Sequence, residues 1–433
     1  MQTTIAHDED SLALATSADD VDGLNAEFYG AIRFPGPPIL MERLKSTRFW
    51  ADAMDQELGR RGDPVLPGEG ARIWVAGCGT NQAVITALMF PDAQVVGSDL
   101  SAPSLAMAGQ TARQLGVRNL ELRNESIHTA YEDEFDYVIC TGVIHHNADP
   151  GQTLQRLAAA LRPEGVMQMM VYNRYHRAMS TAFQKMVRAL LGDTGYAYEK
   201  EVAMARRFVD HFAADDGPAG ESAMGPWLAT YADRSDAELA DSLVQPVEHS
   251  YTVESLDELG RDAGLEMLAP YPNQFDAAKD NLDWELELGD PELQAAYDAL
   301  PDVRRWQVTN LFTMNKSPML WFYMQRQDSP YPRRTTRELC DAFLAGRHVP
   351  TSTTRQVHLC GPGGTFKSTP DSEFPFPVLK GKGDARRVYE ALDPKEPLGA
   401  TMERLGIDTG NMRLVNRLRM NLASTAFPLL KAI

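Results

Sequence analysis

Between residues 71 and 172, short apolar runs alternate with amphipathic segments that are long enough to form helices. Strands that are buried on both faces have continuous apolar sequences, and the helices between them connect neighbouring parallel strands. The pattern predicts strands at residues 72–76, 94–98, 119–123, 135–141 and 165–172. We therefore expect an α/β fold with a doubly wound, Rossmann-like sheet that helices cover on both faces.

The sequence on either side of this region extends the predicted architecture. Apolar runs at residues 266–271 and 319–325 predict two more strands, which makes a seven-stranded sheet. Residues 39–59 follow a proline-rich turn and carry apolar side chains at roughly helical spacing, which predicts a lead-in helix. Residues 173–250 are rich in Ala, Met, Phe and Arg and predict a helical insertion.

Proline and glycine become frequent after Pro330, which is typical of a domain boundary. The predicted parts are an acidic amino-terminal segment over 1–38, the α/β domain over 39–327 and a smaller accessory domain over 328–433. In the last part, Leu414, Leu418 and Leu422 form an apolar stripe at helical spacing. We interpret this domain as a packing unit or as the interface of a possible homodimer.

Charge and composition exclude several classes of protein. The 433 residues carry a formal net charge of −18, which repels phosphate backbones, so nucleic acid is not an expected partner. The alternative is a local basic patch at 413–419. No apolar run approaches the roughly 18 residues of a membrane span, so no membrane domain is expected. No Lys or Arg precedes Arg33, which predicts a cytoplasmic protein. Four scattered cysteines without a Cys-x-x-Cys pair predict no disulfide framework and no metal site.

The strongest functional motif is the glycine turn that follows the first of these strands, in the sequence Ile73-Trp-Val-Ala-Gly-Cys-Gly-Thr-Asn81. Glycines at such a turn allow the backbone to approach a ligand and present helix amides to it. Asp99 ends the next strand, where an acid in a doubly wound sheet accepts hydrogen bonds from the hydroxyls of a ribose. The turn contains only Gly77 and Gly79 and lacks a P-loop lysine, which favours a nucleoside cofactor without phosphates.

The order of four motifs resembles that of the class I S-adenosylmethionine-dependent methyltransferases. These motifs are the glycine loop, Asp99, the Phe135-Asp136 pair, and a Gly142-Val-Ile-His-His146 phrase followed by Asp-Pro. The similarity is specific over residues 71–172 and looser as far as Gln325. It is strongest with bacterial methyltransferases of unassigned acceptor that have a long carboxyl extension. Two departures are Asn81, where many relatives have a third glycine, and Ser126, where many have an acid that binds the adenine amine.

The resemblance implies a role for each residue of the cofactor site. Gly77 and Gly79, within the loop that begins at Ala76 and includes Cys78, would pack against the methionine part of S-adenosylmethionine. Asp99 would hold the ribose. The remaining implied contacts are Leu100 and Ile127 on either side of the adenine, Ser126 at its edge, and Thr141 and Gly142 near the sulfonium.

The candidates for acceptor chemistry follow the fourth and fifth strands. His145 and His146 lie at the carboxyl edge of the predicted sheet, and either is a candidate base with an ordinary pKa near neutral pH. The simpler interpretation is that one packs on the cofactor pocket and the other is solvated. Tyr172 opens an aromatic and basic segment that would face the acceptor. Phe28 and Tyr29 lie in a segment that would fold over the cofactor as a lid.

The sequence therefore predicts a methyltransferase that transfers the methyl group of S-adenosylmethionine to a small-molecule metabolite or natural-product intermediate and releases S-adenosylhomocysteine. The helical insertion favours this hypothesis because it would enclose a small acceptor. One alternative is a protein or peptide methyltransferase that uses the carboxyl-terminal unit for docking. Another is a protein that binds the cofactor without methylating, since a fold does not fix a reaction.

Overall fold

A seven-stranded sheet forms the centre of the computed structural model, which describes residues 12–13, 18–32, 38, 40–192, 197–214, 223–314, 316–374 and 383–433. The strands lie in the order β5-β4-β3-β6-β7-β10-β9, and β10 alone runs antiparallel to its neighbours in this sheet. Their bounds are β3 (Arg72–Ala76), β4 (Gln94–Asp99), β5 (Leu120–Asn124), β6 (Phe135–Thr141), β7 (Leu161–Tyr172), β9 (Leu265–Pro270) and β10 (Met319–Arg326). The predicted doubly wound α/β fold is confirmed.

Helices cover both faces of the sheet. On one face lie α2 (Phe49–Glu57), α3 (Gln82–Met89) and α4 (Ala102–Leu115), and on the other lie α5 (Pro150–Ala160), α10 (Val253–Asp262) and α13 (Asp302–Thr313). Trp74 and Phe322 pack on the second face, whereas Tyr137 and Tyr323 pack on the first. Successive strand residues point to opposite faces, so apolar residues at every position are needed to bury both.

The chemistry of the helix ends explains where the elements begin. Asp149 accepts a hydrogen bond from the backbone nitrogen of Gln152, and Pro150 occupies the first turn of α5, as the sequence indicates. Ser101 caps α4 in the same way, and Gly116 ends that helix with a φ of 63°.

The predicted lead-in helix over 39–59 is partly wrong. Residues Leu40–Leu44 form strand β2, which pairs antiparallel with β12 (Thr354–Cys360), and the helix begins only at Phe49. Met41 and Leu44 are buried, although Leu40 is exposed. The partner strand lies more than 300 residues away in the sequence, so no local pattern indicates the pairing.

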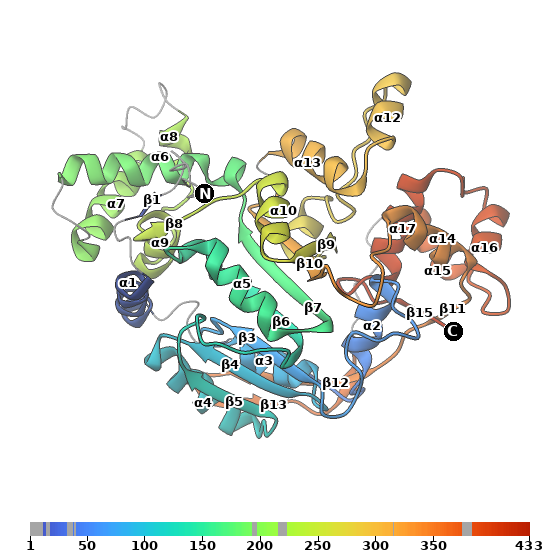
Figure 1. The fold of residues 1–433 in the computed structure, drawn as a ribbon, viewed down its shortest axis with the longest axis horizontal. Helices are drawn as coiled ribbons and strands as arrows, with labels where there is room; N and C mark the ends of the chain where they lie inside the picture. Colours follow the sequence, from blue (N-terminus) through green and yellow to red (C-terminus); the bar gives the residue numbers. More distant parts are fainter. Residues whose placement is uncertain are drawn as a thin grey trace.

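The chain between β7 and α10 folds into helices around an apolar cluster. These elements are α6 (Arg174–Leu191), α7 (Tyr198–Ala213), α8 (Met224–Ala229), α9 (Asp236–Leu243) and the short strand β8 (Val247–Glu248), which pairs with β1 (Leu12–Ala13). The cluster includes Phe183, Val209 and Leu239, and Phe28 of α1 (Ala18–Ile32) packs into it. Figure 1 shows these helices at one end of the view and the last helices of the chain at the other.

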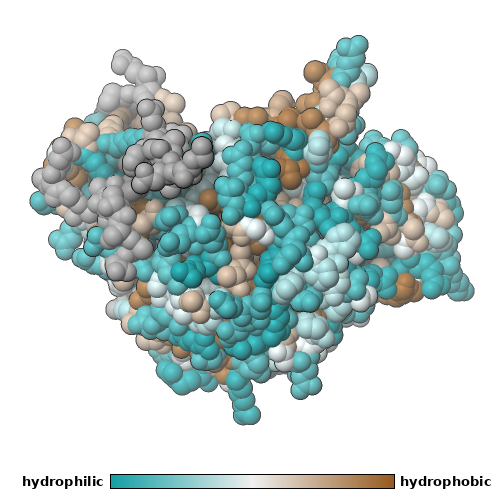
Figure 2. Space-filling model, in the orientation of Figure 1, coloured by the Kyte–Doolittle hydropathy of each residue, from teal (hydrophilic) through white to brown (hydrophobic). Residues whose placement is uncertain are grey.

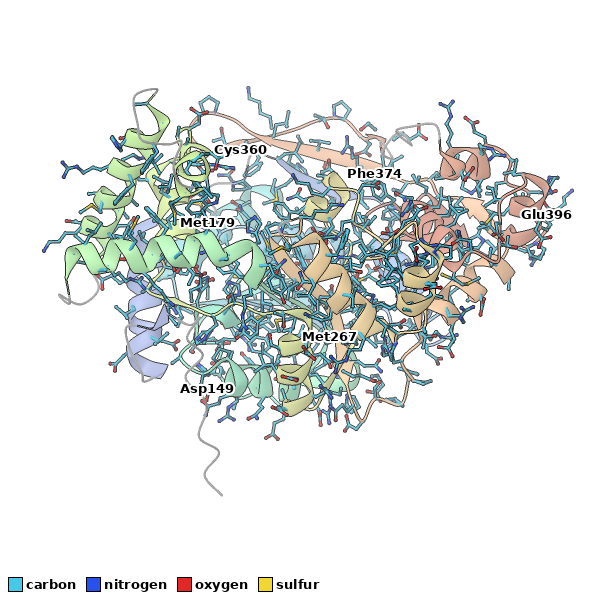
Figure 3. The ribbon with its side chains drawn as sticks, turned by 90° about the horizontal axis from the view of Figure 1, so that it is seen from above. Asp149, Met179, Met267, Cys360, Phe374 and Glu396 are labelled. Carbon is cyan, nitrogen blue, oxygen red and sulfur yellow. The ribbon has the colours of Figure 1, made fainter. Side chains whose placement is uncertain are left out.

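The remaining elements between β9 and the end of the chain comprise short helices and strands. They are α11 (Gln274–Ala278), α12 (Pro291–Asp298), α14 (Thr336–Ala345), β11 (His348–Pro350), β13 (Phe366–Ser368), β14 (Ser372–Glu373), α15 (Asp384–Glu390), α16 (Leu398–Arg404), α17 (Met412–Ala423) and β15 (Leu430–Ala432). Cys360, Phe374 and Glu396 are spread along the molecule in Figure 3, so the chain after β10 extends across it before it reaches the last helices. Leu418 and Leu422 of the predicted apolar stripe are buried within this chain's own cluster.

An apolar area lies on the surface of α12 and α13. Leu293, Leu311, Phe312 and Met314 are exposed on or beside α12 and α13, and Figure 2 shows brown surface over these helices. No helix among the described residues is both long and apolar enough to span a membrane.

Buried and partly buried hydrogen bonds join α2 to the end of the chain. The side chain of Gln56 donates to the backbone oxygens of Ala423 and Leu430 at 3.1 and 3.0 Å. The Glu57 carboxylate accepts hydrogen bonds from the backbone nitrogen and the hydroxyl of Thr425 at 2.7 and 2.8 Å. Its other oxygen, Oε1, is buried without a partner among the described residues. Burial therefore raises the pKa of Glu57 to about 7.

We expect Glu57→Gln to become more stable relative to the wild type as the pH rises from about 4.5 to about 7. In that window the folded wild type holds a proton that the unfolded chain has lost, so its free energy of unfolding falls with pH. The difference should change by roughly 2–3 kcal/mol, since one pKa unit corresponds to about 1.4 kcal/mol. Chemical denaturation at pH 4.5, 5.5 and 7 measures it, and a difference that does not vary with pH would refute the assignment.

Candidate functional site

The glycine turn connects β3 to α3 in a conformation that requires glycine. Gly77 and Gly79 have φ angles of +67° and +55°, which L side chains rarely adopt. A Cβ atom on Gly77 would lie 2.4 Å from Cγ2 of Val143, so the backbone of the turn passes directly against the segment after β6. Ala76 and Cys78 are buried, and the Cys78 sulfur faces Gly97 of β4, so that only the backbone of these two residues is offered to a ligand.

Asp99 ties this turn to the end of β4. Its Oδ2 accepts a hydrogen bond from the backbone nitrogen of Gly79 at 2.7 Å, and its Oδ1 accepts one from that of Ser101 at 2.8 Å. Burial raises the pKa of Asp99, and the two amide donors oppose this effect. Each carboxylate oxygen has a second lone pair, so the carboxylate retains the capacity to accept two ribose hydroxyls.

The predicted adenine side of the site lies between β4 and the segment after β5. Asn124 donates from its side chain to the backbone oxygens of Asp99 and Leu100, which fixes the two strand ends together. Ile127 is buried, and Ser126 donates its hydroxyl to Oδ2 of Asp22 at 2.6 Å. No local pattern in the sequence indicates Asp22, because it belongs to α1 and lies 104 residues away from Ser126.

Helix α1 lies along this edge of the site. Besides the Asp22 contact, Asn25 donates from its side chain to the backbone oxygen of His146 at 2.7 Å. The Tyr29 hydroxyl accepts a hydrogen bond from Gln245 at 2.9 Å, and burial raises its pKa well above the ordinary value. The helix therefore bridges the predicted adenine edge and the helical insertion.

Thr141 and Gly142 end β6 next to the glycine turn. The Thr141 hydroxyl donates to Oε1 of Gln82, the first residue of α3, at 2.8 Å. Gly142 has a φ of +78°, and its backbone nitrogen donates to the oxygen of Met170 at 3.2 Å. The turn, Asp99, Thr141 and Gly142 thus lie at one edge of the sheet, at the carboxyl ends of adjacent parallel strands.

The histidines at this edge are neutral. His145 and His146 lie in the short helix η1 (Ile144–His146) and are 0% and 3% exposed. Burial lowers the pKa of His145 well below its usual value and that of His146 to about 4. The His146 Nδ1 lies 2.8 Å from the backbone oxygen of Val247, so Nδ1 carries the proton and Nε2 the lone pair. Both nitrogens of His145 lack a partner among the described residues.

Tyr172 lies against His145, with their ring centroids 4.0 Å apart. The guanidinium of Arg177 lies over the Tyr172 ring, 4.3 Å from its centroid, and forms a buried ion pair with Glu248. Burial raises the pKa of Tyr172 well above its usual value, so its hydroxyl is protonated at neutral pH. The structure therefore brings together the three residues that the sequence indicates for catalysis, beside a charged pair that the sequence does not indicate.

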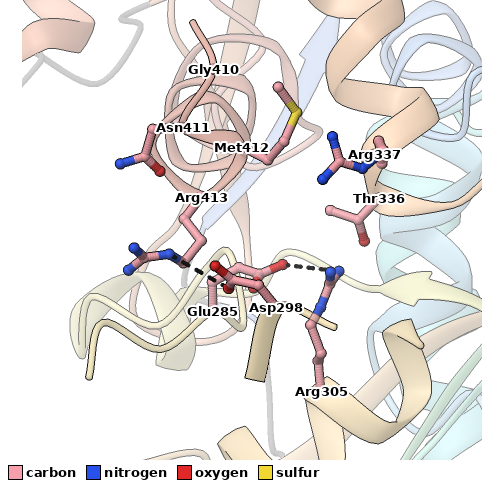
Figure 4. A pocket seen from close by; sticks show the side chains of 9 residues that line it. All are labelled: Glu285, Asp298, Arg305, Thr336, Arg337, Gly410, Asn411, Met412 and Arg413. Atoms are coloured by element: carbon pink, nitrogen blue, oxygen red, sulfur yellow. Dashed lines mark ion pairs between the residues drawn. The ribbon is translucent and has the colours of Figure 1, made fainter. Parts of the chain in front are cut away.

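A small polar cavity lies elsewhere, between α12, α13 and the helices near the carboxyl end. Its volume is about 200 Å³, and Figure 4 shows Arg305 paired with Glu285 and Arg413 paired with Asp298 across it, at 3.3 and 3.8 Å. None of its lining residues belongs to the predicted cofactor site. Within the described ranges, no group of three or more His, Cys, Asp or Glu side chains is arranged to hold a metal.

Comparison with known proteins agrees with this geometry. Residues 69–205 match a family model described as a methyltransferase domain. The relatives include a ubiquinone biosynthesis O-methyltransferase of Paracidovorax citrulli, 29% identical over 28% of this chain and 51% of its own length. Another is the tRNA 5-carboxymethoxyuridine methyltransferase of Escherichia coli, which is 30% identical over 31% of this chain and 50% of its own length. The chain spans about half the length of these curated relatives.

A solved structure, PKMT2 from Rickettsia typhi in complex with AdoHcy, shares the fold. The two chains are 15% identical, the match covers 77% of this chain and 65% of the PKMT2 chain, and the TM-score is 0.52. The sheet order, the glycine turn and Asp99 define a Rossmann-like methyltransferase fold. Residues 69–205 therefore form a methyltransferase domain within a Rossmann-like methyltransferase fold, and the residues of its turn and strand ends fit S-adenosylmethionine.

We expect Asp99→Asn to weaken the binding of S-adenosylhomocysteine by about 10- to 100-fold, because hydrogen bonds to a charged group contribute roughly 1.5–3 kcal/mol. Asp92→Asn is the matched control, because Asp92 is exposed in the turn before the same strand. Calorimetric titration measures both variants. Equal affinities for Asp99→Asn and Asp92→Asn would exclude Asp99 from the site.

Proposed function

We propose that the protein is an S-adenosylmethionine-dependent methyltransferase that acts on a small molecule. The observation that carries this proposal is the hydrogen bond between the Asp99 carboxylate and the backbone of the glycine turn, at the edge of the sheet where the carboxyl ends of β3, β4 and β6 meet. The match of residues 69–205 to a methyltransferase domain supports it.

Each part of the site would hold one part of the cofactor. Gly77 and Gly79 would contact the methionine portion and Asp99 the ribose, with Leu100 and Ile127 on the two faces of the adenine. When bound, the cofactor supplies a methyl group whose bond to the sulfonium breaks as the acceptor's lone pair attacks, the bonding electrons staying on sulfur. The protein's task is to align the acceptor and, for a hydroxyl, to accept its proton.

His146 is the better candidate for that base, because its Nε2 carries the lone pair while Val247 holds the proton on Nδ1. A pKa of about 4 makes it a weak base, which suits an acceptor that is itself acidic. His145 and the protonated Tyr172 would then orient the acceptor. Arg177 lies against the Tyr172 ring and would restrict its position.

The position of α1 suits two roles: a lid over the cofactor, and a source of the acidic side chain that is absent at Ser126. Ser126 occupies the place where many related enzymes have an acid, and Asp22 brings a carboxylate to that place from α1. We propose that Asp22 replaces the missing acid at the adenine edge. The helix would then open for the cofactor to enter and close over it.

The alternatives concern the acceptor. A relative named for tRNA shows that this domain type is found in nucleic-acid enzymes, but a net charge of −18 disfavours RNA here. A protein or peptide acceptor would need an open cleft. Instead, α1 and the insertion helices cover the edge with His145, which is buried, and Tyr172, which is partly buried. An enclosed edge of this kind favours a small acceptor.

Incubation of the protein with methyl-labelled S-adenosylmethionine and a bacterial extract tests the proposal. We expect label in the fraction below a few kilodaltons and its loss in Asp99→Asn but not in Asp92→Asn. Label found in protein or RNA would replace the small-molecule proposal with the corresponding alternative. Cofactor binding without transfer to any fraction would favour a non-methylating protein.

We expect Asp22→Ala to release S-adenosylhomocysteine about tenfold faster, because the lid loses its contact with Ser126 and the adenine edge loses a charged acceptor. Glu27→Ala is the control, since Glu27 is exposed on the same helix. Stopped-flow displacement with excess cofactor gives the two rates. Rates that are the same in both variants would show that α1 does not close over the cofactor.

A further inference from the structure

A cavity of about 590 Å³ lies against the face of the sheet that α2 and α3 cover. Its floor is formed by residues of β6, β7 and β10, and its walls by α2, α3, the start of α11 and the segment after α17. Pockets for small ligands measure about 300–1,000 Å³, so the cavity has the size of a ligand site. From sequence alone, the acceptor is expected among the residues after β7, and no sequence pattern indicates this cavity.

The cavity adjoins the cofactor site. Thr141 pairs with Met170 on β7, and Met170 pairs with Trp321 on β10, so these three residues form one row across the sheet. Neighbouring strands are about 4.8 Å apart, which places the Trp321 backbone roughly 10 Å from that of Thr141. Gln82 lines the cavity, and its side-chain oxygen accepts a hydrogen bond from the hydroxyl of Thr141. Tyr271 follows β9 and brings a cavity wall to the same edge of the sheet.

Among the residues that the structure describes, no charged side chain lines this cavity. Its polar lining consists of amides and hydroxyls, among them Gln82, Gln168 and Asn273. An ionised group that is buried without a partner loses far more hydration energy than such neutral dipoles return. The lining therefore selects against a charged occupant.

Aromatic rings form much of the floor and walls. They belong to Trp50, Phe90, Tyr271, Trp321, Tyr323 and Phe427. The rings of Tyr271 and Trp321 are stacked, with centroids 5.0 Å apart and an interplanar angle of 21°, and Tyr323 meets Tyr271 edge-on at 5.0 Å. Flat surfaces and ring edges of this kind favour a planar aromatic guest, which stacks on one ring and meets the edge of another.

One polar group on the floor is suited to a guest with oxygen atoms. Tyr137 donates its hydroxyl to the side-chain oxygen of Gln168, which leaves the Gln168 amide nitrogen as a donor. A buried donor without a partner is costly, and an oxygen of a bound molecule would satisfy it.

We infer that this cavity binds the methyl acceptor, and that the acceptor is a neutral, planar aromatic molecule that carries hydroxyl or carbonyl oxygens. The inference rests on the proposed function, and it names the class of molecule on which that function acts. The acceptor's ring lies between the aromatic walls, and its reacting end points along the sheet toward Thr141 and the cofactor.

The probe for this inference is 2,3-dihydroxynaphthalene, titrated calorimetrically into the full-length protein saturated with S-adenosylhomocysteine. We expect one binding site per chain. The carboxylate analogue 3-hydroxy-2-naphthoate, which is charged at neutral pH, should bind at least about tenfold more weakly, because its charge finds no partner in the cavity. Equal affinities for the two molecules, or no binding of the neutral probe, would overturn the inference.

Variants that fill the cavity locate the probe. Ala277→Phe and Ala426→Phe each add a ring to the lining, from α11 and from the segment after α17, and each should weaken binding of the probe by at least about tenfold. Ala278→Phe is the matched control, because Ala278 is exposed on the same helix as Ala277, and its affinity should stay within about twofold of the wild type. Unchanged probe binding in both filled variants would refute the assignment.

The same titrations separate this inference from the proposed function. S-adenosylhomocysteine should bind the wild type, both filled variants and the control with similar affinity, which also shows that each variant is folded. A wild type that binds no S-adenosylhomocysteine would contradict the methyltransferase proposal itself. A wild type that binds it but rejects the neutral probe would contradict only the acceptor assignment.

Discussion

The Asp99 carboxylate connects the two segments from which the cofactor site is built. It accepts one hydrogen bond from the glycine turn after β3 and one from the first residues after its own strand β4. These contacts hold the turn, the start of α3 and the start of α4 in one arrangement. The turn is also tightly packed, because a Cβ on Gly77 would overlap Val143 beyond β6. Three neighbouring strands are thereby held at one edge, and everything that binds there depends on their spacing.

The two faces of the sheet are filled differently, and this difference shapes the site. On one face the core continues from Trp74 to Phe322 beneath α5, α10 and α13. On the other, α3 covers only part of the sheet, and the cavity remains between it, α2 and α11. Side chains alternate along β7, so Gln168, Met170 and Tyr172 point to the face that holds the cavity, and the Tyr172 ring contacts His145.

The end of the chain supports that side. Strand β12 pairs with β2 in a small antiparallel sheet. Gln56 and Glu57 of α2 form hydrogen bonds to the backbone of the segment that follows α17. Thr425 and Phe427 from this segment form part of the cavity wall. The carboxyl-terminal residues therefore take part in shaping the proposed acceptor site, whatever further partner they have.

The sequence by itself determined the strands of the sheet, the glycine turn, Asp99 and the cap at Asp149, because each depends on local patterning or on the conformational needs of single residues. Only the tertiary structure decided which distant segments meet. It replaced part of a predicted helix with β2, brought Asp22 to Ser126 from 104 residues away, and gave His146 a low pKa by burying it. Pairing, burial and cavity shape depend on long-range packing, for which no short stretch of sequence carries a signal.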